Sequence, residues 1–573
     1  MKSEQNWVSN NFLDKLLQIL PRLQRIIYIA LYFFAIINIF LLFINLFSGQ
    51  YYMIHYYTVT SACLLTLNLI LKHINTKFSV VDLFLTIIDL IFISIAIFAT
   101  HSDRVFQFYL LGRQTFYFIK NRSSHAYDDT FYENLMRNPP VFVLLSFATT
   151  IFIGTLLLLL PVATADGTTT IIDALFTSTS ATCVTGLIVH DTGTHFSLFG
   201  QIVILLLLQI GGLGIMTISS AFAVMLGQKL TLKGETMMQD VLDGTSKVNM
   251  INLLKSIIVV TFIFELLGTL TLYLSYHAVD FKGSNTLYHA LFHAISAFCN
   301  AGFSLYPDSM TQFRTHFSFN FIMTSLIIVG GIGFPVLADL YKIIKNKLSP
   351  TRLSLHSKIV ITATLLLILA GFIGFFISEY NSEMNNFNIK NRIYASYFQS
   401  VTTRTAGFNT IDNSELSNGS VLISSLLMFI GASPGSTGGG VKTTALVVIM
   451  LSVFTILTNN KDVNVFRRKV SEDIIKKVMA LITISISVLS FMIFLLLIIE
   501  NLPFRKIIFE AFSAFGTVGL SMGITPKLSG LGKTIIIFLM YFGRVGPLTL
   551  IYAFSEKKNK VNYRYIEEKI SIG

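Results

Sequence analysis

Long apolar segments, each followed by a short one, recur along most of this chain. From about residue 133, a long apolar stretch is followed by an apolar segment of about 11 to 14 residues, a run with one glycine, and a second long stretch. A long stretch has the roughly 20 residues that a helix needs to cross a bilayer, whereas the short segment can only enter the membrane and return. The pattern predicts an all-α polytopic membrane protein.

The first repeat illustrates the unit. Val141 to Leu160 forms the first span, Ile171 to Ala181 the short segment, and a second span follows Gly186. Irregular backbone at membrane depth is tolerated only where it lines water or is buried in protein. Four such segments therefore predict four span, re-entrant loop and span repeats around one pore. The C-terminal end of each short helix carries partial negative charge, which favours a cation.

The repeat also sets the expected domains. Residues 1–132 precede it and form an N-terminal helical bundle with three or four helices, the fourth being the weaker stretch Arg104 to Arg122. A bundle that packs at the periphery of the pore is favoured over a sensor-like one, because arginines at every third position are missing. In the sensor-like alternative, Asp82 and Asp89 would face Arg104 and Arg113. The remaining domains are pore repeats 133–235, 236–350, 351–465 and 466–556, and a tail, 557–573.

One glycine-containing run recurs in all four repeats, as TCVTGL, FCNAGF, TRTAGF and FGTVGL. Its glycines, Gly186, Gly302, Gly407 and Gly519, are separated by 116, 105 and 112 residues. A single glycine is as well explained by helix packing, but four in matching context are not. Glycine adopts positive φ without a clash, and rings of backbone carbonyls can replace the water shell of a monovalent cation. The runs therefore predict a cation selectivity filter.

Glycines also mark the second spans, as QIGGLG, VGGIG and FGRVG, where we expect close helix approach or bending. The third repeat differs, because GASPGSTGGGVKTT, Gly431 to Thr444, interrupts its second span. Pro434 and five glycines cannot hold a regular helix there. We expect a broken helix below the filter that acts as a gate, with a static kink as the alternative.

Composition and charge agree with a membrane class. The chain is 53% hydrophobic and 13% charged, with a mean hydropathy of +0.68. Lysines and arginines are densest in the loops after the second spans, so the positive-inside rule places the inter-repeat loops and the C-terminus in the cytoplasm and the filters outward. The net charge of +12 is thus explained by topology and membrane lipids rather than nucleic acid.

The few polar groups within the spans each have an expected role. Arg544 should face protein or the pore and bind carbonyls of the broken span, because a lone arginine in lipid is costly. We interpret Glu265 as a hydrogen-bonded structural acid, with an ion ligand as the alternative. We interpret Arg404 as a brace for the neighbouring pore helix. Three cysteines without CxxC spacing give no zinc or disulfide pattern. His289 and His293 lack an HExxH glutamate, so helix packing is favoured over zinc.

Six ordered motifs over about Asn138 to Phe554 resemble the TrkH/KtrB superfamily of K+ transporters (Trk/Ktr/HKT), nearest to the KtrB type. They are LSFATTIFIGTLLLLLPVAT, IDALFTSTSATCVTGLIVHDTGTHFSLFGQIVILLLLQIGGLGIMT, HAISAFCNAGFSLYP, TTRTAGFNT, GASPGSTGGGVKTT and SAFGTVGLSMGITP. The resemblance implies a K+ uptake subunit, a homodimer, and a cytoplasmic nucleotide-binding regulatory subunit of the KtrA or TrkA type. It also implies a gate at Gly431 to Thr444 with a gate-facing Arg544, and a glycine at Gly186 where relatives with serine tend to admit Na+.

The predicted function is passive or Na+-assisted K+ movement across the cytoplasmic membrane, with K+ and possibly Na+ as transported ions, no bound cofactor and no transition metal. The alternative class is an intramembrane enzyme, for which no catalytic constellation is recognised. An ATP-driven pump would need a separate ATP-binding partner. Filter carbonyls are expected from Cys183, Val184, Thr185, Gly186, Asn300, Ala301, Gly302, Thr405, Ala406, Gly407, Thr517, Val518 and Gly519. Gate residues are expected to be Gly435, Ser436, Thr437, Gly438, Gly439, Gly440, Lys442 and Arg544.

Overall fold

The computed structural model describes residues 139–547 and 549, apart from 215–246, 279–284, 348, 381, 383 and 386. The chain forms two compact units, Met1–Phe131 and Tyr132–Gly573, and every described residue lies in the second. The expected N-terminal bundle, its Asp82, Asp89, Arg104 and Arg113, and the tail at 557–573 therefore lie outside the described residues.

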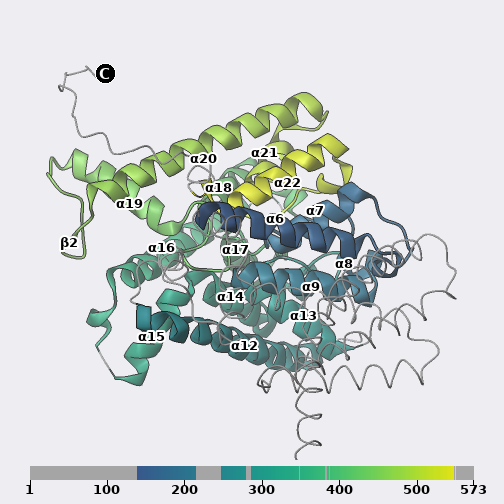
Figure 1. Cartoon of the computed structure of the whole chain (residues 1–573), viewed down its shortest axis with the longest axis horizontal. Helices are drawn as coiled ribbons and strands as arrows, with labels where there is room; N and C mark the ends of the chain where they lie inside the picture. Colours follow the sequence, from purple (N-terminus) through teal and green to yellow (C-terminus); the bar gives the residue numbers. More distant parts are fainter. Residues whose placement is uncertain are drawn as a thin grey trace, which may run out of the picture. The chain divides into compact units, whose positions relative to one another are not determined.

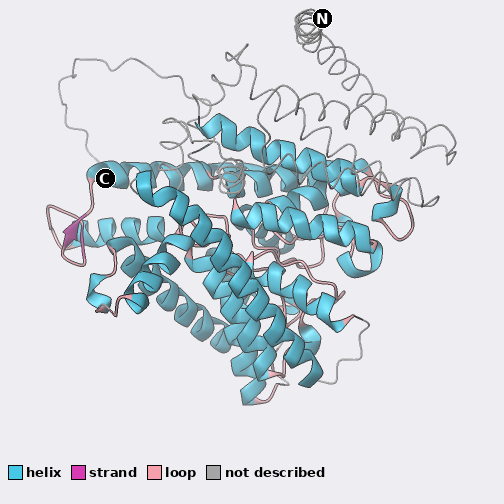
Figure 2. Cartoon of the chain, turned by 60° about the horizontal axis from the view of Figure 1, so that its bottom comes forward, coloured by secondary structure: helices cyan, strands magenta, loops and turns pink. Residues whose placement is uncertain are grey.

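Helices account for almost all of the regular structure in the described residues (Figure 2). The first spans of the four repeats are α6 (Pro139–Leu158), α12 (Lys247–Ala278), α16 (Leu355–Ser378) and α20 (Glu472–Ile499). The short apolar segments form the pore helices α7 (Ile171–Thr182), α13 (Thr286–Phe298), α17 (Ile389–Thr402) and α21 (Phe504–Gly516). The second spans contain α9 (Leu198–Leu213), α14 (Phe317–Ile332) with α15 (Phe334–Lys345), α18 (Asn418–Phe429) with α19 (Thr443–Leu457), and α22 (Gly530–Val545).

Smaller elements connect these helices. A two-residue hairpin, β1 (Asn464–Val465) with β2 (Arg468–Lys469), lies between α19 and α20. One short helix and five 3-10 turns complete the described structure: α8 (Thr192–His195), η1 (Pro161–Ala163), η2 (Thr311–Phe313), η3 (Pro350–Arg352), η4 (Asn413–Glu415) and η5 (Thr525–Lys527).

Length and composition identify three described helices that can cross a membrane, within α12, α16 and α20. The α14–α15 pair qualifies as a fourth only if the two helices count as one span, since they meet at an angle of 101°. Helix α9 has 16 residues, about 24 Å at the usual rise per residue, which is less than the hydrocarbon core. The described part of α9 is therefore too short to cross alone, and the second span of the second repeat is bent.

Glycines explain where the second helices stop. Helices α9, α14 and α22 each end at a glycine with positive φ: Gly214 at 80°, Gly333 at 101° and Gly546 at 90°. This conformation ends a helix and suits a residue without a Cβ. The expected bend is therefore confirmed in the second repeat, where the chain turns from α14 into α15. In the third repeat the expected break is also confirmed, because α18 stops at Phe429 and α19 begins at Thr443.

The repeats pack in a closed cyclic order. The second helix of each repeat contacts the pore helix of the next, as α9 with α13, α14 with α17, α18 with α21, and α22 with α7. The last of these contacts joins the fourth repeat back to the first. Figure 1 shows the result, with α12 and α20 on opposite sides and the pore helices between them.

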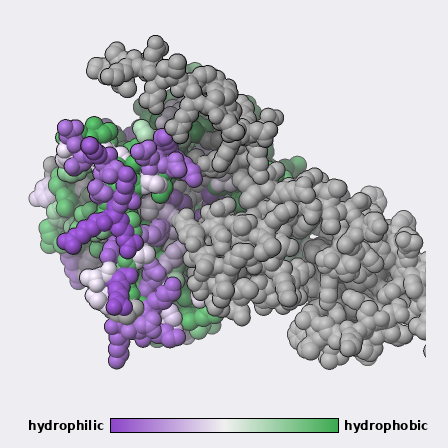
Figure 3. Space-filling model, turned by 60° about the vertical axis from the view of Figure 1, so that its left-hand side comes forward, coloured by the Kyte–Doolittle hydropathy of each residue, from purple (hydrophilic) through white to green (hydrophobic). Residues whose placement is uncertain are grey.

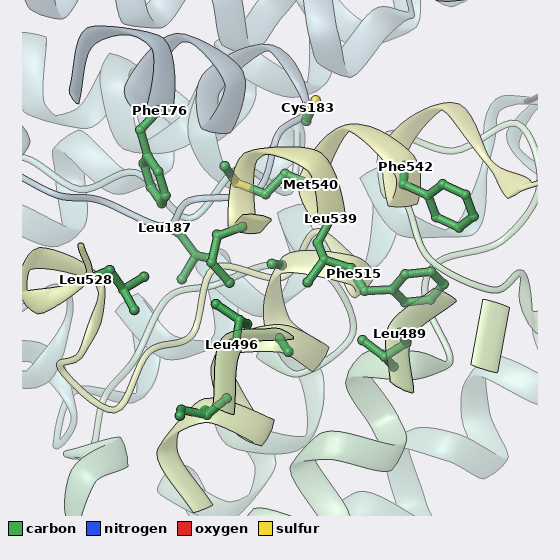
Figure 4. Close-up of a cluster of buried hydrophobic side chains, with 14 of the residues drawn as sticks. Phe176, Cys183, Leu187, Leu489, Leu496, Phe515, Leu528, Leu539, Met540 and Phe542 are labelled. Carbon is green, nitrogen blue, oxygen red and sulfur yellow. The ribbon is translucent and has the colours of Figure 1, made fainter. Parts of the chain in front are cut away.

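Buried apolar side chains fill the seams between repeats. At the seam between the fourth and first repeats, Phe176 and Leu187 join Phe515, Leu539 and Met540 in one cluster, drawn in Figure 4. Comparable clusters join the first repeat to the second, the second to the third, and the third to the fourth. Burial of apolar side chains stabilises each seam, so the ring of repeats is closed by packing as well as by the covalent chain.

An ion pair adds to the seam between the fourth and first repeats. Lys533 Nζ, near the start of α22, lies 2.6 Å from Asp173 Oδ1, near the start of α7. Asp173 also accepts from Thr170 Oγ1 at 2.8 Å. Both charged side chains are largely buried, so the pair is protected from screening by solvent. The two repeats that lie furthest apart in the sequence are thus directly joined.

Candidate ion-conducting site

The four predicted filter glycines lie together in a ring. A Cβ atom built on Gly186 would lie 3.0 Å from Gly302 Cα, one on Gly302 would lie 3.0 Å from Gly407 Cα, and one on Gly407 would lie 3.2 Å from Gly519 Cα. The ring closes because a Cβ on Gly519 would lie 2.9 Å from Gly186 Cα. Each of these distances is shorter than an ordinary van der Waals contact, so a side chain at any of the four positions would force neighbouring backbone atoms to shift.

Backbone carbonyls face these glycines in the same cyclic order. The carbonyl oxygen beside each glycine belongs to the residue that precedes the next glycine in the ring. The four oxygens are those of Ala301, Ala406, Val518 and Thr185. All four come from residues predicted to supply filter carbonyls. The structure therefore brings a set of carbonyl oxygens from four strands to one place, which is the arrangement that a dehydrated cation requires.

The backbone of each run has a second positive φ, two residues before the glycine. The φ angles are 57° at Val184, 58° at Asn300, 73° at Thr405 and 50° at Thr517. Positive φ is uncommon for non-glycine residues and costly for a β-branched one. Sequence reasoning missed this feature, because three of the four residues are β-branched and would be expected to avoid it. Its occurrence at the same position in all four repeats indicates a shared functional conformation.

A hydroxyl group near the end of each pore helix supports its own filter run. Ser180 Oγ accepts from Gly186 N at 3.1 Å, and Ser513 Oγ accepts from Gly519 N at 3.0 Å. In the other two repeats the hydroxyl donates to the carbonyl after the glycine. These bonds are Ser296 Oγ to Phe303 O at 2.8 Å and Thr402 Oγ1 to Phe408 O at 2.5 Å. Each strained run is therefore held by its own helix.

In two repeats a second polar group braces the segment that follows the filter glycine. Glu510 on α21 is buried and accepts from Ser521 Oγ at 2.8 Å and from Thr525 Oγ1. His293 on α13 occupies the same place, nine residues before its filter glycine, where its Nε2 accepts from Leu305 N at 3.1 Å. His293 Nδ1 lies 3.0 Å from Tyr276 Oη, so packing and hydrogen bonding explain this histidine. The sequence signal was available, since both residues share a register relative to their glycines.

The predicted gate, Gly431 to Thr444, contains the loop between α18 and α19, residues 431–441. Its two ends pair, because Ile430 and Val441 form a parallel bridge and Gly431 N donates to Val441 O at 2.9 Å. A loop with paired ends is a compact unit rather than a simple kink in a helix. We call residues 431–441 the gate loop.

The first part of the gate loop contacts the second repeat. Ser433 N donates to Gly331 O at 3.1 Å, and Phe334 N donates to Gly435 O at 3.0 Å. Thr437 Oγ1 donates to Phe298 O, the last residue of α13, at 3.3 Å. The loop therefore rests where α14 bends into α15, directly beside the second pore helix.

The last part of the gate loop contacts the fourth repeat. Gly439 N donates to Thr517 Oγ1 at 3.0 Å, and Gly440 N donates to Gly543 O at 3.3 Å. Since the second and fourth repeats are not neighbours in the cyclic order, a loop that contacts both extends across the ring. The gate loop thus lies next to the filter runs.

Two partly buried cations bind the carbonyls of this region. Arg544 donates to Thr437 O, in the gate loop, and to Gly211 O, in the first repeat. Lys442 Nζ donates to Gly438 O at 2.8 Å. The expectation that Arg544 binds carbonyls of the broken span is confirmed, and its bond to the first repeat was not foreseen. The gate loop is therefore bonded directly to the second and fourth repeats, and Arg544 links it to the first.

The structure gives partners to two further polar groups. Arg404 is buried, and its Nη2 donates to Thr364 Oγ1 of α16, a first span, at 3.5 Å. Its role as a brace for the neighbouring pore helix stays a prediction. Glu265 is 4% exposed, and its Oε2 accepts from Gln209 Nε2 at 3.1 Å, which fits the hydrogen-bonded acid. Gln209 Oε1 in turn accepts from Cys299 Sγ at 3.6 Å.

No cluster of three or more metal-ligating side chains occurs in the part of the chain that the structure describes. Cys183 and Cys299 are buried free thiols at equivalent positions, three residues before their filter glycines. Gly212 leaves space for Cys299, because a Cβ there would lie 2.6 Å from the sulfur. The two thiols therefore pack behind the filter runs.

Known proteins share both the sequence and the fold. Residues 104–563 match the TrkH family, described as "Cation transport protein". The chain is 44% identical over 438 residues to "Ktr system potassium uptake protein B" of Bacillus subtilis, which covers 76% of this chain and 97% of that protein. It is 39% identical over 437 residues to the protein of the same name from Vibrio alginolyticus, covering 76% and 95%.

A third relative is "Potassium/sodium uptake protein NtpJ" of Enterococcus hirae, 35% identical over 444 residues and covered over 97% of its length. Among solved structures, the potassium transporter TrkH from Vibrio parahaemolyticus has the same fold, with a TM-score of 0.61, 17% identity, and coverage of 88% of this chain and 98% of that one. The apolar helices and this fold make the chain a multi-pass membrane protein, and its relatives are transporters, not enzymes. On the family match and the identity to these relatives, the chain belongs to the TrkH/KtrB superfamily of cation transport proteins.

Proposed function

We propose that this chain is the ion-translocating subunit of a K+ uptake system and that K+ crosses the membrane through the glycine ring. The single observation that carries the proposal is the ring itself, in which carbonyl oxygens from Thr185, Ala301, Ala406 and Val518 lie against four glycines. Backbone carbonyls in such a ring can replace the hydration shell of K+. The names of the two Ktr relatives support K+ as the transported ion.

Sodium enters the proposal as a stimulating or accompanying ion. The name of the Enterococcus hirae relative includes both potassium and sodium. With one glycine per repeat, the filter offers few tight sites, so we expect weaker discrimination than in a filter with two glycines per strand. Transport is passive or assisted by Na+, and neither form requires a cofactor bound by this chain.

The gate loop supplies control in this proposal. Docked against the second and fourth repeats, it lies beside the filter runs and is tied to Arg544 and Lys442. Cations bound to the loop carbonyls place positive charge near the path of a permeating cation, which raises the barrier to passage. Displacement of the loop would lower this barrier. A static kink predicts no such response.

The distribution of basic residues supports an orientation of the chain in the membrane. Exposed lysines and arginines lie in the connections α15–α16 and α19–α20, which follow the second and third repeats. Among them are Lys347, Arg352, Arg467 and Arg468. Figure 3 shows a strongly hydrophilic surface on the side where this end of the unit lies. We propose that this end faces the cytoplasm, that the filters face outward, and that the membrane is the cytoplasmic membrane.

A nucleotide-binding regulatory subunit of the KtrA or TrkA type would bind at the cytoplasmic end. The word "system" in the names of the Ktr relatives supports a multi-component assembly. We propose a homodimer as the form within the membrane, surrounded by lipid.

Isotopic K+ uptake into proteoliposomes that contain the purified subunit tests the function. We expect K+ uptake along its gradient, and the rate with and without a Na+ gradient distinguishes passive from Na+-assisted transport. Vesicles with the Gly519→Leu variant serve as the control, because a large side chain there would collide with the ring. Equal K+ uptake by the control variant and the unaltered chain would refute permeation through the ring.

A further inference from the structure

The gate loop touches the filter through one hydrogen bond. Of the residues predicted to form the filter, all of which the structure describes, only Thr517 bonds to the gate loop, where its Oγ1 accepts from Gly439 N at 3.0 Å. Both groups lie in the buried interior, and Thr517 has no exposed surface. A hydrogen bond between buried groups is costly to break without a replacement partner. The bond therefore connects the position of the loop to one filter strand.

The backbone at Thr517 is strained, so the bond to the gate loop helps to hold an unfavourable conformation. Thr517 has a φ of 50°, in the left-handed region that a β-branched residue disfavours. Its strand is held in this conformation by two further bonds, Thr517 N to Ala514 O at 3.1 Å and Val518 N to Ser513 O at 2.9 Å. The side chain of a strained filter residue is thus fixed by the gate loop, so release of the loop removes one of its restraints.

Gly439, the donor residue in the gate loop, packs closely against Thr517. A Cβ on Gly439 would lie 2.5 Å from Thr517 Oγ1 and 2.8 Å from its Cγ2. Only glycine allows the loop backbone to approach this closely. The amide therefore reaches the hydroxyl because position 439 has no side chain.

The equivalent residue of the third repeat is a natural comparison. Thr405 also has positive φ and also lies beside a gate-loop glycine, since a Cβ on Gly438 would lie 3.0 Å from Thr405 Cβ. Its hydroxyl lies 3.4 Å from the side-chain amide of Asn300, and its partner is thus another filter residue. Two threonines in matching positions differ in whether they bond to the gate loop.

We propose that Thr517 is a positioning residue that latches the gate loop to the filter. Its hydroxyl accepts the Gly439 amide when the loop is docked, and loss of this bond loosens the loop and raises K+ flux. This inference rests on the proposed function of the loop as a gate. Beyond that function, the inference assigns the coupling between gate loop and filter to one hydrogen bond, which Thr517 of the fourth repeat accepts.

Hydrogen exchange of the full chain in detergent or nanodiscs tests the latch without measuring transport. In Thr517→Val, which keeps the shape and removes the acceptor, we expect exchange at Gly438 to Gly440 to become about fivefold faster, the effect of losing one net hydrogen bond. Thr517→Ser keeps the hydroxyl and should restore slow exchange. Thr405→Val is the matched control and should leave the exchange of the Gly439 amide unchanged.

Thr517→Cys is a second variant in case the valine variant does not fold, because a thiol is a weak acceptor and should also speed exchange. Equal exchange in unaltered chain, valine and cysteine variants would overturn the latch. K+ flux in proteoliposomes then tests the coupling. A rise in flux in Thr517→Val, reversed in Thr517→Ser, supports it, whereas faster exchange with unchanged flux overturns it. If the unaltered chain carried no K+, the proposed function would fail, while the exchange result would still decide the latch.

Discussion

Adding one methyl group to each filter glycine should reduce selectivity to different degrees. At Gly302, a Cβ would lie 2.9 Å from Ala406 O and 3.0 Å from Gly407 Cα, about half an ångström closer than an ordinary contact. At Gly186, Gly407 and Gly519, the carbonyl oxygen of the next strand is closer still. An alanine at any of these positions must therefore push aside an oxygen that is proposed to bind K+, and the push is smallest at Gly302.

The size of the effect follows from this ranking. Left-handed backbone costs alanine about 1–2 kcal/mol at every one of the four positions, so this term does not distinguish them. Displacement of the carbonyl is the term that differs. We expect the preference for K+ over Na+ to fall at least about tenfold, which corresponds to 1.4 kcal/mol, in Gly186→Ala, Gly407→Ala and Gly519→Ala. We expect Gly302→Ala to lose less.

Gly523→Ala provides the matched control. Gly523 has a φ of +76° and no atom within 4 Å of its built Cβ, so alanine there has the backbone cost without the contact. Competition between K+ and Na+ uptake, in vesicles or in cells that lack other K+ uptake systems, measures the preference. The reasoning is refuted if Gly523→Ala changes selectivity as much as Gly186→Ala, or if Gly302→Ala is the most harmful of the four.

Three further predictions concern the filter, the gate and the seam between the fourth and first repeats. Gly186→Ser should raise Na+ permeation, because its side chain displaces Ala301 O; an unchanged K+ to Na+ flux ratio would contradict this. Removal of Gly435–Gly440 should raise K+ flux if the loop is a gate, and unchanged or lower flux in a folded protein would favour a static kink. Lys533→Ala should lower the free energy of unfolding by about 2 kcal/mol, because Asp173 loses a charged hydrogen bond, and thermal unfolding in detergent measures it. Lys527→Ala, an exposed lysine of η5, is the control and should have little effect.

Hydrophobic patterning located the described elements well. The four short apolar segments became pore helices, and the interruption at Gly431 was found between α18 and α19. These features were readable because each depends on local chemistry, namely the length of an apolar run and the presence of proline and glycine. The domain limits and the filter roles stay predictions.

The features that sequence reasoning missed depend on contacts between distant residues. Nothing near Val184 or Thr517 in the sequence favours positive φ, and their own side chains oppose it. The conformation is imposed by the pore helix behind each run, through Ser180 and Ser513, and by the neighbouring strands. The order in which the repeats contact one another could not be predicted either. Repeat spacing gives the number of repeats but does not indicate which repeats are in contact.

Covalent linkage of the four repeats gives this ring a property that four identical subunits would lack. The gate loop extends from the third repeat to contacts in the second and the fourth, and Arg544 ties it to the first through Gly211 O. Four copies of such a loop would compete for the same space beside the ring. A single chain can place the loop in one repeat and shape the other three to receive it, as Gly330 and Gly543 do by supplying carbonyls to Thr437 N and Gly440 N. Asymmetry among the repeats is therefore a physical requirement for a gate of this kind.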